Sequence, residues 1–263
     1  MLPLSRLTAA EARNLTGLLF DLDDTVLDHG RLSEAAYRSL FRMKEAGLSL
    51  YIVTGRPSGW AEVLGRMWPV DGAIAEYGAV AVVEERGHLT VVDRVPEAER
   101  ESRRERLLEL VRLLRERFVD LVPASDVGAR RSDYTFDIGE TRKVAPEIVE
   151  AASAEARRHG AFTTTSSVHL HVSFDRADKA SGSLWLLHRQ TGLDPTEGRL
   201  RYAFVGDSEN DAACFAAFQT TVGVANLRGR LTVRPRFVTS RERGAGFAEL
   251  AETLIALRNS APT

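Results

Sequence analysis

A short apolar run that ends in two acidic residues most constrains how this chain can fold. Residues 18–20 are Leu-Leu-Phe, and Asp21 and Asp23 follow at their end. Such a run is typical of a buried strand in an open α/β sheet, where ligands bind at the carboxyl ends of the strands. Two acids at this place indicate a bound cation, because a buried carboxylate without a counter-charge is costly. The alternative is an acidic strand exit on a solvated edge, and this motif alone leaves both interpretations open.

Two further segments carry groups that suit a phosphate ligand. The strand-like run 48–53 leads into Thr54, Gly55 and Arg56. The Thr54 hydroxyl and the following backbone N–H groups can bind a phosphate oxygen, and Gly55 lets the backbone approach closely. Lys179 opens an apolar-periodic helix in a chain that is otherwise rich in arginine, which indicates a need for a compact ammonium. The alternatives are an ordinary loop turn and a surface lysine.

A second acidic cluster follows the apolar run 202–205. The sequence continues Gly-Asp-Ser-Glu-Asn-Asp over residues 206–211. Carboxylate and amide oxygens at a strand end make a ligand set for a hard cation. The same residues also suit a capped helix start, with Asp207 or Ser208 as N-cap, and both interpretations can hold together.

The order of strand-like and helix-like segments predicts the fold class. Strands and helices alternate up to about residue 76 and again after Lys179, which is typical of a parallel, doubly wound sheet with right-handed crossovers. Two strand–helix–strand sets interrupt this order and predict an inserted domain. The expected elements are helices over 33–46, 59–67, 96–118, 146–159 and 247–257, and strands over 48–53, 79–83, 89–92, 133–137, 162–165 and 168–174, with another strand opening at 73–74.

In chain order, the motifs D-x-D-x-T, T-G-R, K and G-D-x-x-N-D resemble the four motifs of the haloacid-dehalogenase superfamily. Residues 71–79, the G-D-S-E-N-D spacing and residues 222–226 resemble its Cof-like group, subclass IIB. That group includes sucrose-phosphate, trehalose-phosphate and mannosyl-phosphoglycerate phosphatases and a phosphomannomutase. Two residues depart from its usual pattern, since Tyr77 stands where many relatives have Asn and Asp24 stands where Gly is common.

The resemblance implies an α/β fold with a Rossmann-like, doubly wound parallel-sheet core and an inserted α+β cap. The core would comprise residues 1–85 and 178–263, and the cap, a lid for substrate specificity, residues 86–177. The implied activity is magnesium-dependent hydrolysis of a small phosphate monoester, expected to be a sugar phosphate, through an aspartyl-phosphate intermediate. A phosphosugar mutase on the same fold is the alternative.

The same resemblance assigns roles to individual residues. Asp21 would be the nucleophile, and Asp23 the general acid and then the general base, with nearby carboxylates favouring its protonated form. Lys179 would offset the carboxylates. The implied phosphate-binding residues are Thr54, Gly55, Arg56, Lys179 and Asn210. The implied magnesium site comprises Asp21, the Asp23 backbone carbonyl and Asp207, with Asp211 supporting these ligands from behind.

The leaving group would be bound by the cap, because the core motifs suit only phosphate and metal. The cap candidates are Arg130, Arg131, Ser166, Ser167, His169 and His171. The two histidines lie two apart on one strand and therefore share a face, which makes a metal pair conceivable. A sheet face that looks toward the active site is the favoured alternative.

Composition excludes several classes of protein. A net charge of −2 argues against a nucleic-acid partner held by phosphate contacts. The single cysteine, Cys214, lies in an apolar helical stretch, so a buried thiol in a reducing compartment is expected. No apolar run reaches transmembrane length and no signal peptide is recognised, so a cytoplasmic protein without a membrane partner is expected, as a monomer or a homodimer.

Overall fold

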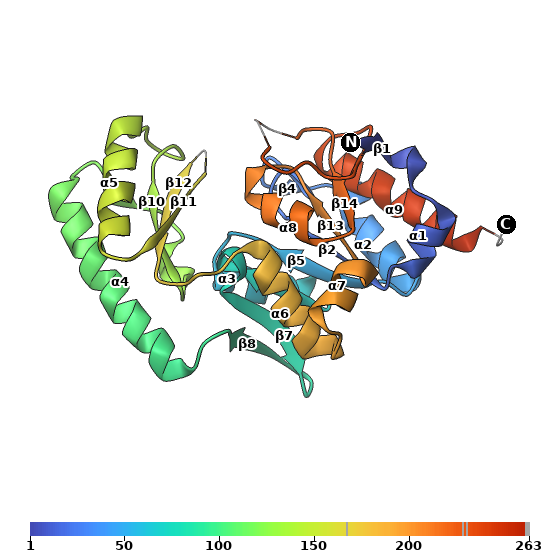
Figure 1. Ribbon diagram of the computed structural model, residues 1–263, viewed down its shortest axis with the longest axis horizontal. Coiled ribbons are helices and arrows are strands. Elements are labelled where there is room, and N and C mark those ends of the chain that lie inside the picture. Colours follow the sequence, from blue (N-terminus) through green and yellow to red (C-terminus); the bar gives the residue numbers. More distant parts are fainter. Residues whose placement is uncertain (167, 228, 230, 261–263) are drawn as a thin grey trace.

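A nine-stranded sheet organises most of the chain in the computed structural model, which describes residues 1–166, 168–227, 229 and 231–260 (Figure 1). The strand order is β1-β15-β14-β13-β2-β5-β6-β7-β8. The pairs from β1 to β6 are parallel, and β7 and β8 add an antiparallel hairpin at one edge. The strands are β1 Leu2–Pro3, β2 Gly17–Phe20, β5 Ser49–Val53, β6 Gly72–Ala75, β7 Val80–Glu85, β8 His88–Asp93, β13 Tyr202–Gly206, β14 Thr220–Gly223 and β15 Phe237–Val238.

Helices cover both faces of this sheet, so the predicted α/β, doubly wound fold is confirmed. Leu18 and Phe20 of β2 point to one face and Leu19 to the other, because strand side chains alternate. The first face packs against α1 Ala9–Asn14, α2 Glu34–Glu45, α3 Ser58–Met67 and α9 Arg243–Asn259. The second face packs against α6 Lys179–Thr191 and α8 Ala212–Ala217, and α7 Pro195–Arg201 lies beside α6. None of the described helices is long and apolar enough to cross a membrane.

The strand order reverses at β2, and this reversal places the candidate site. From β2 the chain winds outward through β5 to β6, whereas β13, β14 and β15 lie on the other side of β2. In such sheets ligands bind outside the carboxyl ends of the strands, at the point where the winding reverses. Asp21, Thr54 and Asp207 each follow the last residue of β2, β5 and β13 respectively.

A second, smaller sheet lies between β8 and α6 in the chain (Figure 1). Its antiparallel order is β11-β12-β10-β9, and α4 and α5 pack on one face to form a separate core. The elements are α4 Glu97–Arg117, β9 Val122–Pro123, β10 Asp133–Asp137, α5 Pro146–Arg158, β11 Phe162–Thr165 and β12 His169–Ser173. We call residues 97–173 the cap. The division at 85/86 and 177/178 stays a prediction, and β8, which it assigns to the insert, pairs with β7 of the larger sheet.

Short elements complete the chain. They are the hairpin of β3 Leu27–Asp28 with β4 Arg31–Leu32, and the 3-10 helices η1 Leu4–Arg6, η2 Glu76–Gly78, η3 Val127–Ala129 and η4 Glu209–Asp211.

Local chemistry explains where the predicted helices begin and end. The Ser33 side chain accepts the Ala36 N–H and caps α2, and Gly47 follows the helix with a φ of +78°. The predicted stripe on α4 is buried at Leu107, Leu110 and Leu114. The last helix begins at Arg243, whereas the sequence predicted a start near 247. The prediction missed the first turn because its glycines carry no apolar pattern.

A buried arginine joins the two connections between core and cap. Arg100 of α4 donates to both carboxylate oxygens of Asp93, which ends β8, at 2.7 and 2.8 Å. It also pairs with Asp175 in the segment that returns from β12 to α6, and Arg103 reaches the same carboxylate at 2.5 Å. The Arg100 side chain is only 7% exposed. These ion pairs are therefore screened little by solvent and restrain both connections together.

We predict that Arg100→Ala lowers the free energy of unfolding by about 3 kcal/mol, because it leaves Asp93 and Asp175 buried without their shared partner. Urea unfolding followed by circular dichroism would measure this loss. Arg112→Ala, on the exposed side of the same helix, is the matched control and should change stability by less than about 0.5 kcal/mol. Equal effects of the two substitutions would contradict the role assigned to Arg100.

Candidate active site

Three buried carboxylates and one ammonium meet at the carboxyl ends of β2 and β13. Oxygen atoms of Asp21, Asp207 and Asp211 all lie within 4.8 Å of one another. The Lys179 ammonium lies 2.8 Å from Asp21 Oδ1 and 2.8 Å from Asp211 Oδ1. All four residues are buried, and none of them is more than 6% exposed. The structure therefore brings together four residues that the sequence assigned to one site.

Lys179 is held in place from two directions. It is the first residue of α6, which is capped by Asp178, and it reaches across to η4. Asn210 Oδ1 accepts a third hydrogen bond from its ammonium at 2.9 Å. The alternative of a surface lysine is excluded, because Lys179 is only 1% exposed.

Asp211 shapes the loop that follows β13. Its Oδ2 accepts the backbone N–H groups of Asp207 at 2.9 Å and Ser208 at 3.2 Å. A Cβ at Gly206 would come within 2.2 Å of the same oxygen, so this position requires glycine. One oxygen of Asp211 thus orders the loop while the other pairs with Lys179. The predicted helix start is therefore present, with Ser208 as N-cap, and the role of this segment as a ligand set stays a prediction.

Burial and like charges set the protonation of the cluster. Burial raises the pKa of Asp21 well above its ordinary value, against the opposing charge of Lys179, and Asp211 and Asp207 add to the rise. Burial alone would lower the pKa of Lys179, but Asp21 and Asp211 raise it above its ordinary value. Lys179 therefore stays a cation, and a further positive charge in the cluster would favour ionised Asp21.

This cluster fits a metal ion. Its donors are oxygens only, which suits a hard divalent cation, and a cation would relieve the repulsion that raises the Asp21 pKa. It is the one group of this kind among the residues that the structure describes. The Asp23 carboxylate is not part of it, so Asp23 could contribute only through its backbone.

The Asp23 side chain forms an ion pair with an arginine and lies outside the group of three carboxylates. Arg56 donates to both Asp23 oxygens, from Nε at 2.8 Å and from Nη2 at 2.6 Å, and its guanidinium lies over the Trp60 ring at 4.1 Å. The expectation that nearby carboxylates favour a protonated Asp23 stays a prediction, and in this conformation the partner of its carboxylate is Arg56. The Asp23 side chain is 44% exposed, whereas Thr54 beside Arg56 is buried.

The two departures from the usual family pattern both occupy left-handed backbone. Asp24 has a φ of +54° and Tyr77 a φ of +55°. Glycine and asparagine are the residues that adopt this conformation most readily, which explains their preference at these places. Here the Asn226 side chain donates to the Asp24 carbonyl and Arg243 pairs with its carboxylate, so this turn is held by partners.

A buried glutamate joins the core to the cap beside the site. Glu76 of η2 accepts the backbone N–H of Ser58 in the core and those of Arg131, Ser132 and Asp133 in the cap, at 2.6–3.3 Å. The Ser132 hydroxyl donates to it as well. Sequence reasoning included Glu76 only within a family segment. A glutamate between Ala75 and Tyr77 gives no local sign that distant N–H groups surround it.

The cap candidates differ in where they lie. Arg130 is buried and pairs with Asp126 and Asp133, and it donates to the Gly55 carbonyl. Arg131 is exposed, Ser166 accepts N–H groups within its own turn, and Ser167 lies outside the described residues.

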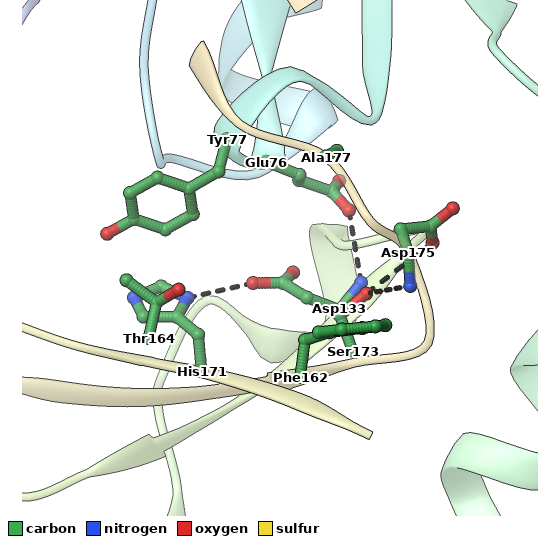
Figure 2. A pocket seen from close by; sticks show the side chains of 9 residues that line it. All are labelled: Glu76, Tyr77, Asp133, Phe162, Thr164, His171, Ser173, Asp175 and Ala177. Carbon is green, nitrogen blue, oxygen red and sulfur yellow. Dashed lines mark hydrogen bonds and ion pairs between the residues drawn. The ribbon is translucent and has the colours of Figure 1, made fainter. Parts of the chain in front are cut away.

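The two cap histidines have separate partners. His169 contacts Glu140 at 3.0 Å, and His171 contacts Asp133 at 2.8 Å. Among described residues they do not belong to a possible metal group. Figure 2 shows His171 under Tyr77, where the cap sheet faces η2 of the core. The sheet face that carries His171 thus meets the core at Tyr77, and the expectation that it looks toward the active site stays a prediction.

Sequence comparison identifies a protein family and individual proteins that this chain is similar to. The sequence model of the family described as haloacid dehalogenase-like hydrolase matches residues 18–122. A phosphoglycolate phosphatase of Archaeoglobus fulgidus is 28% identical over 245 residues, covering 90% of this chain and 96% of that protein. A phosphoglycolate phosphatase of Methanospirillum hungatei is 25% identical over 238 residues, covering 90% and 95%.

Solved structures share the fold. A Thermoplasma acidophilum protein superposes with a TM-score of 0.73 at 18% identity, covering 92% of this chain and 99% of that one. The sucrose-phosphatase of Synechocystis, solved with sucrose and phosphate, has a TM-score of 0.66 at 16% identity, with coverage of 91% and 98%. At these identities the likeness concerns the fold alone.

The raised pKa of Asp21 leads to a prediction about metal-free protein. A raised carboxyl pKa contributes stability at low pH, and this contribution is lost as pH rises through the folded-state value. In excess chelator at pH 8, Asp21→Asn should therefore be more stable than wild type, by about 1 kcal/mol or more. The difference should shrink toward pH 4.

Thermal unfolding followed by circular dichroism across this pH range would measure the difference. Asp120→Asn is the same substitution at an exposed position and should show no such pH-dependent gap. A less stable Asp21→Asn protein at pH 8 would mean that Lys179 already neutralises the cluster and that no cation is needed.

Proposed function

Since the chain belongs to the haloacid dehalogenase-like hydrolases and is a phosphatase of that superfamily, we propose that it hydrolyses a small phosphate monoester with magnesium through an aspartyl-phosphate. The observation that carries this proposal is the Asp21 carboxylate, 2.8 Å from Lys179 and grouped with Asp207 and Asp211. A carboxylate nucleophile divides the hydrolysis into two easier displacements.

Asp21 is the nucleophile in this mechanism. The Leu22 N–H donates to its Oδ1 at 2.8 Å, and Lys179 donates to the same oxygen, so the carboxyl group is held in one orientation. Attack on phosphorus by a carboxylate oxygen forms the acyl phosphate on Asp21 and releases the leaving oxygen. Water then attacks the phosphorus and regenerates the carboxylate. Positioning and charge stabilisation account for most of the catalysis in such a loose transition state.

Asp23 is proposed to carry the proton. It would protonate the leaving oxygen in the first displacement and take a proton from the attacking water in the second. The Arg56 ion pair holds the Asp23 carboxylate away from the carboxylate cluster. Asp23 must therefore exchange Arg56 for the leaving oxygen during the reaction, and Arg56 is then free to approach the phosphate.

Magnesium is the proposed cofactor. Asp21, Asp207, Asp211 and the Asp23 backbone carbonyl would hold it, and when bound it would neutralise charge on the phosphoryl oxygens and offset the three buried carboxylates. Thr54, the N–H groups at Gly55 and Arg56, and Lys179 are the proposed phosphate contacts. Asn210 supports Lys179 through its hydrogen bond.

Two classes of small substrate are candidates. The sequence resemblance to sugar-phosphate phosphatases favours a sugar phosphate. The relatives of A. fulgidus and M. hungatei, which match nearly the whole chain, carry the name phosphoglycolate phosphatase, and this favours phosphoglycolate as the second candidate. A location in the cytoplasm and a monomeric or homodimeric state stay predictions.

The mechanism predicts that Asp21→Asn abolishes turnover while the protein stays folded. Wild type should release inorganic phosphate from a panel of monoesters that includes hexose phosphates and phosphoglycolate, and excess chelator should stop the release until magnesium is restored. Acid quenching during turnover of ³²P-labelled substrate should trap label on wild type but not on Asp21→Asn.

Two results would contradict this proposal. Undiminished turnover in chelator would remove the metal from the mechanism, and label trapped on Asp21→Asn would remove Asp21 as nucleophile. Isomerised phosphosugar without net phosphate release would instead identify the mutase.

Lys179→Arg should be nearly as inactive as Lys179→Ala, with a loss of about 100-fold or more in kcat/KM. The buried pocket fits a compact ammonium with three acceptors, whereas a planar guanidinium is larger and directs its N–H groups differently. Steady-state kinetics of both variants would measure the losses. Near-normal kinetics of Lys179→Arg would reduce this residue to a general positive charge.

A further inference from the structure

Tyr77 of the core and His171 of the cap meet edge to face at the boundary between core and cap. Their ring centroids lie 5.0 Å apart, with the rings 86° from coplanar. We infer that the Tyr77 hydroxyl and His171 Nε2 together bind a hydroxyl group on the leaving group of the substrate. This inference rests on the proposed phosphatase function and names the leaving-group contacts of the same site.

Tyr77 is positioned against the loop proposed to bind phosphate. A Cβ at Gly55 would come within 2.5–2.8 Å of the Tyr77 ring and hydroxyl, so only glycine admits the phenol at this place. The Tyr77 N–H also bonds to the Thr54 carbonyl at 3.2 Å. The hydroxyl end of Tyr77 therefore lies beside the Thr54–Gly55 turn. Burial raises its pKa to about 12, so the phenol keeps its proton and can donate it.

His171 is oriented by its other ring nitrogen. Nδ1 lies 2.8 Å from Asp133 Oδ2 and 3.2 Å from the Thr135 hydroxyl. Burial would raise the Asp133 pKa, but Arg130 and His171 hold it below its ordinary value, so Asp133 is an ionised acceptor. An ionised carboxylate accepts but cannot donate, so the Nδ1 that it contacts carries the proton. Nε2, on the far side of the ring from Asp133, is the nitrogen left for a ligand.

Both remaining polar atoms are available to a ligand. Among the described residues, neither Tyr77 Oη nor His171 Nε2 has a hydrogen-bond partner in the protein. Neither is among the fully buried side-chain atoms that lack one, so both keep some access to solvent. Figure 2 shows the Tyr77 hydroxyl and the ring nitrogen of His171 that is turned from Asp133 on the same side of the cluster.

The cavity that these residues line favours a hydroxyl over a charged group. Its volume is about 40 Å³, room for about three water molecules. It is lined by Glu76, Tyr77, Asp133, Phe162, Thr164, His171, Ser173, Asp175 and Ala177. None of these is a lysine or an arginine, so the lining offers no fixed cation for a carboxylate. A substrate hydroxyl can both donate and accept, as the Tyr77 hydroxyl can, so it can bond to Tyr77 and to His171 Nε2 together.

Three phosphate esters with two-carbon leaving groups test this inference. Ethyl phosphate ends in a methyl group, 2-hydroxyethyl phosphate in a hydroxyl, and 2-phosphoglycolate in a carboxylate. The measured quantity is the ratio of kcat/KM for each polar ester to kcat/KM for ethyl phosphate. This ratio cancels general damage to the catalytic site, since all three esters share the phosphoryl chemistry.

Tyr77→Phe removes only the hydroxyl, and His171→Asn keeps a donor to Asp133 while removing Nε2. Each should lower the ratio for 2-hydroxyethyl phosphate about tenfold, or about 1.4 kcal/mol of transition-state binding. His171→Gln returns a polar group near the Nε2 position and should recover part of the ratio. His159→Asn is the matched control, at an exposed histidine of the cap that follows α5, and should leave the ratio unchanged.

An unchanged 2-hydroxyethyl ratio in folded Tyr77→Phe and His171→Asn would overturn the inference. A selective loss on 2-phosphoglycolate in place of 2-hydroxyethyl phosphate would also overturn it, since the pair would then bind a carboxylate. Circular dichroism establishes that each variant is folded. If wild type releases phosphate neither from these three esters nor from any member of the monoester panel, the proposed function itself fails.

Discussion

The site depends on one buried interaction, the contact of the Lys179 ammonium with Asp21 and Asp211. Three carboxylates from β2 and the β13 loop approach one another closely, which is unfavourable in a protein interior unless positive charge lies between them. Lys179 supplies part of that charge from the first turn of α6, on a segment that returns to the core only after the cap. The cluster therefore forms only when both parts of the core sheet are assembled. One ammonium does not balance three carboxylates, so the cluster favours a further cation.

Polar contacts, more than apolar packing, hold the cap over this site. Each sheet has its own apolar core, and the contacts between them include Glu76 with the N–H groups of 131–133 and Arg130 with the Gly55 carbonyl. Arg100 restrains the two connecting segments. Hydrogen bonds of this kind are directional, so they specify one position of the cap, and their exchange with water lets that position change at modest cost. The proposed role of the cap as a lid over bound substrate would need both properties.

Much of the core fold could be predicted because its signals are local. Continuous apolar runs within 18–20 and 49–53 mark buried strands, and the Ser33 cap with Gly47 marks the limits of α2. The two-residue strands β1 and β15 gave no such signal, since they exist only through pairing with each other and with β14. The motifs placed Asp21, Thr54, Lys179 and Asp207 at one site because parallel strands end at the same edge. Arg56 was assigned to phosphate alone, and its ion pair with Asp23 depends on a distance between two loops that no local pattern carries.

The sequence by itself determined the chemistry that the core can perform, because residue type and position after a strand are enough to assemble carboxylates, hydroxyl and ammonium at a sheet edge. Only the tertiary structure decided what faces that chemistry from the cap. The contact of Tyr77 with His171, and that of Asp133 with His171 Nδ1, join segments far apart in the chain, and each residue looks ordinary in its own surroundings. Their relation depends on how two separately packed sheets are oriented. That orientation is set by the long-range contacts of Glu76, Arg100 and Arg130, which leave no periodic trace in the sequence.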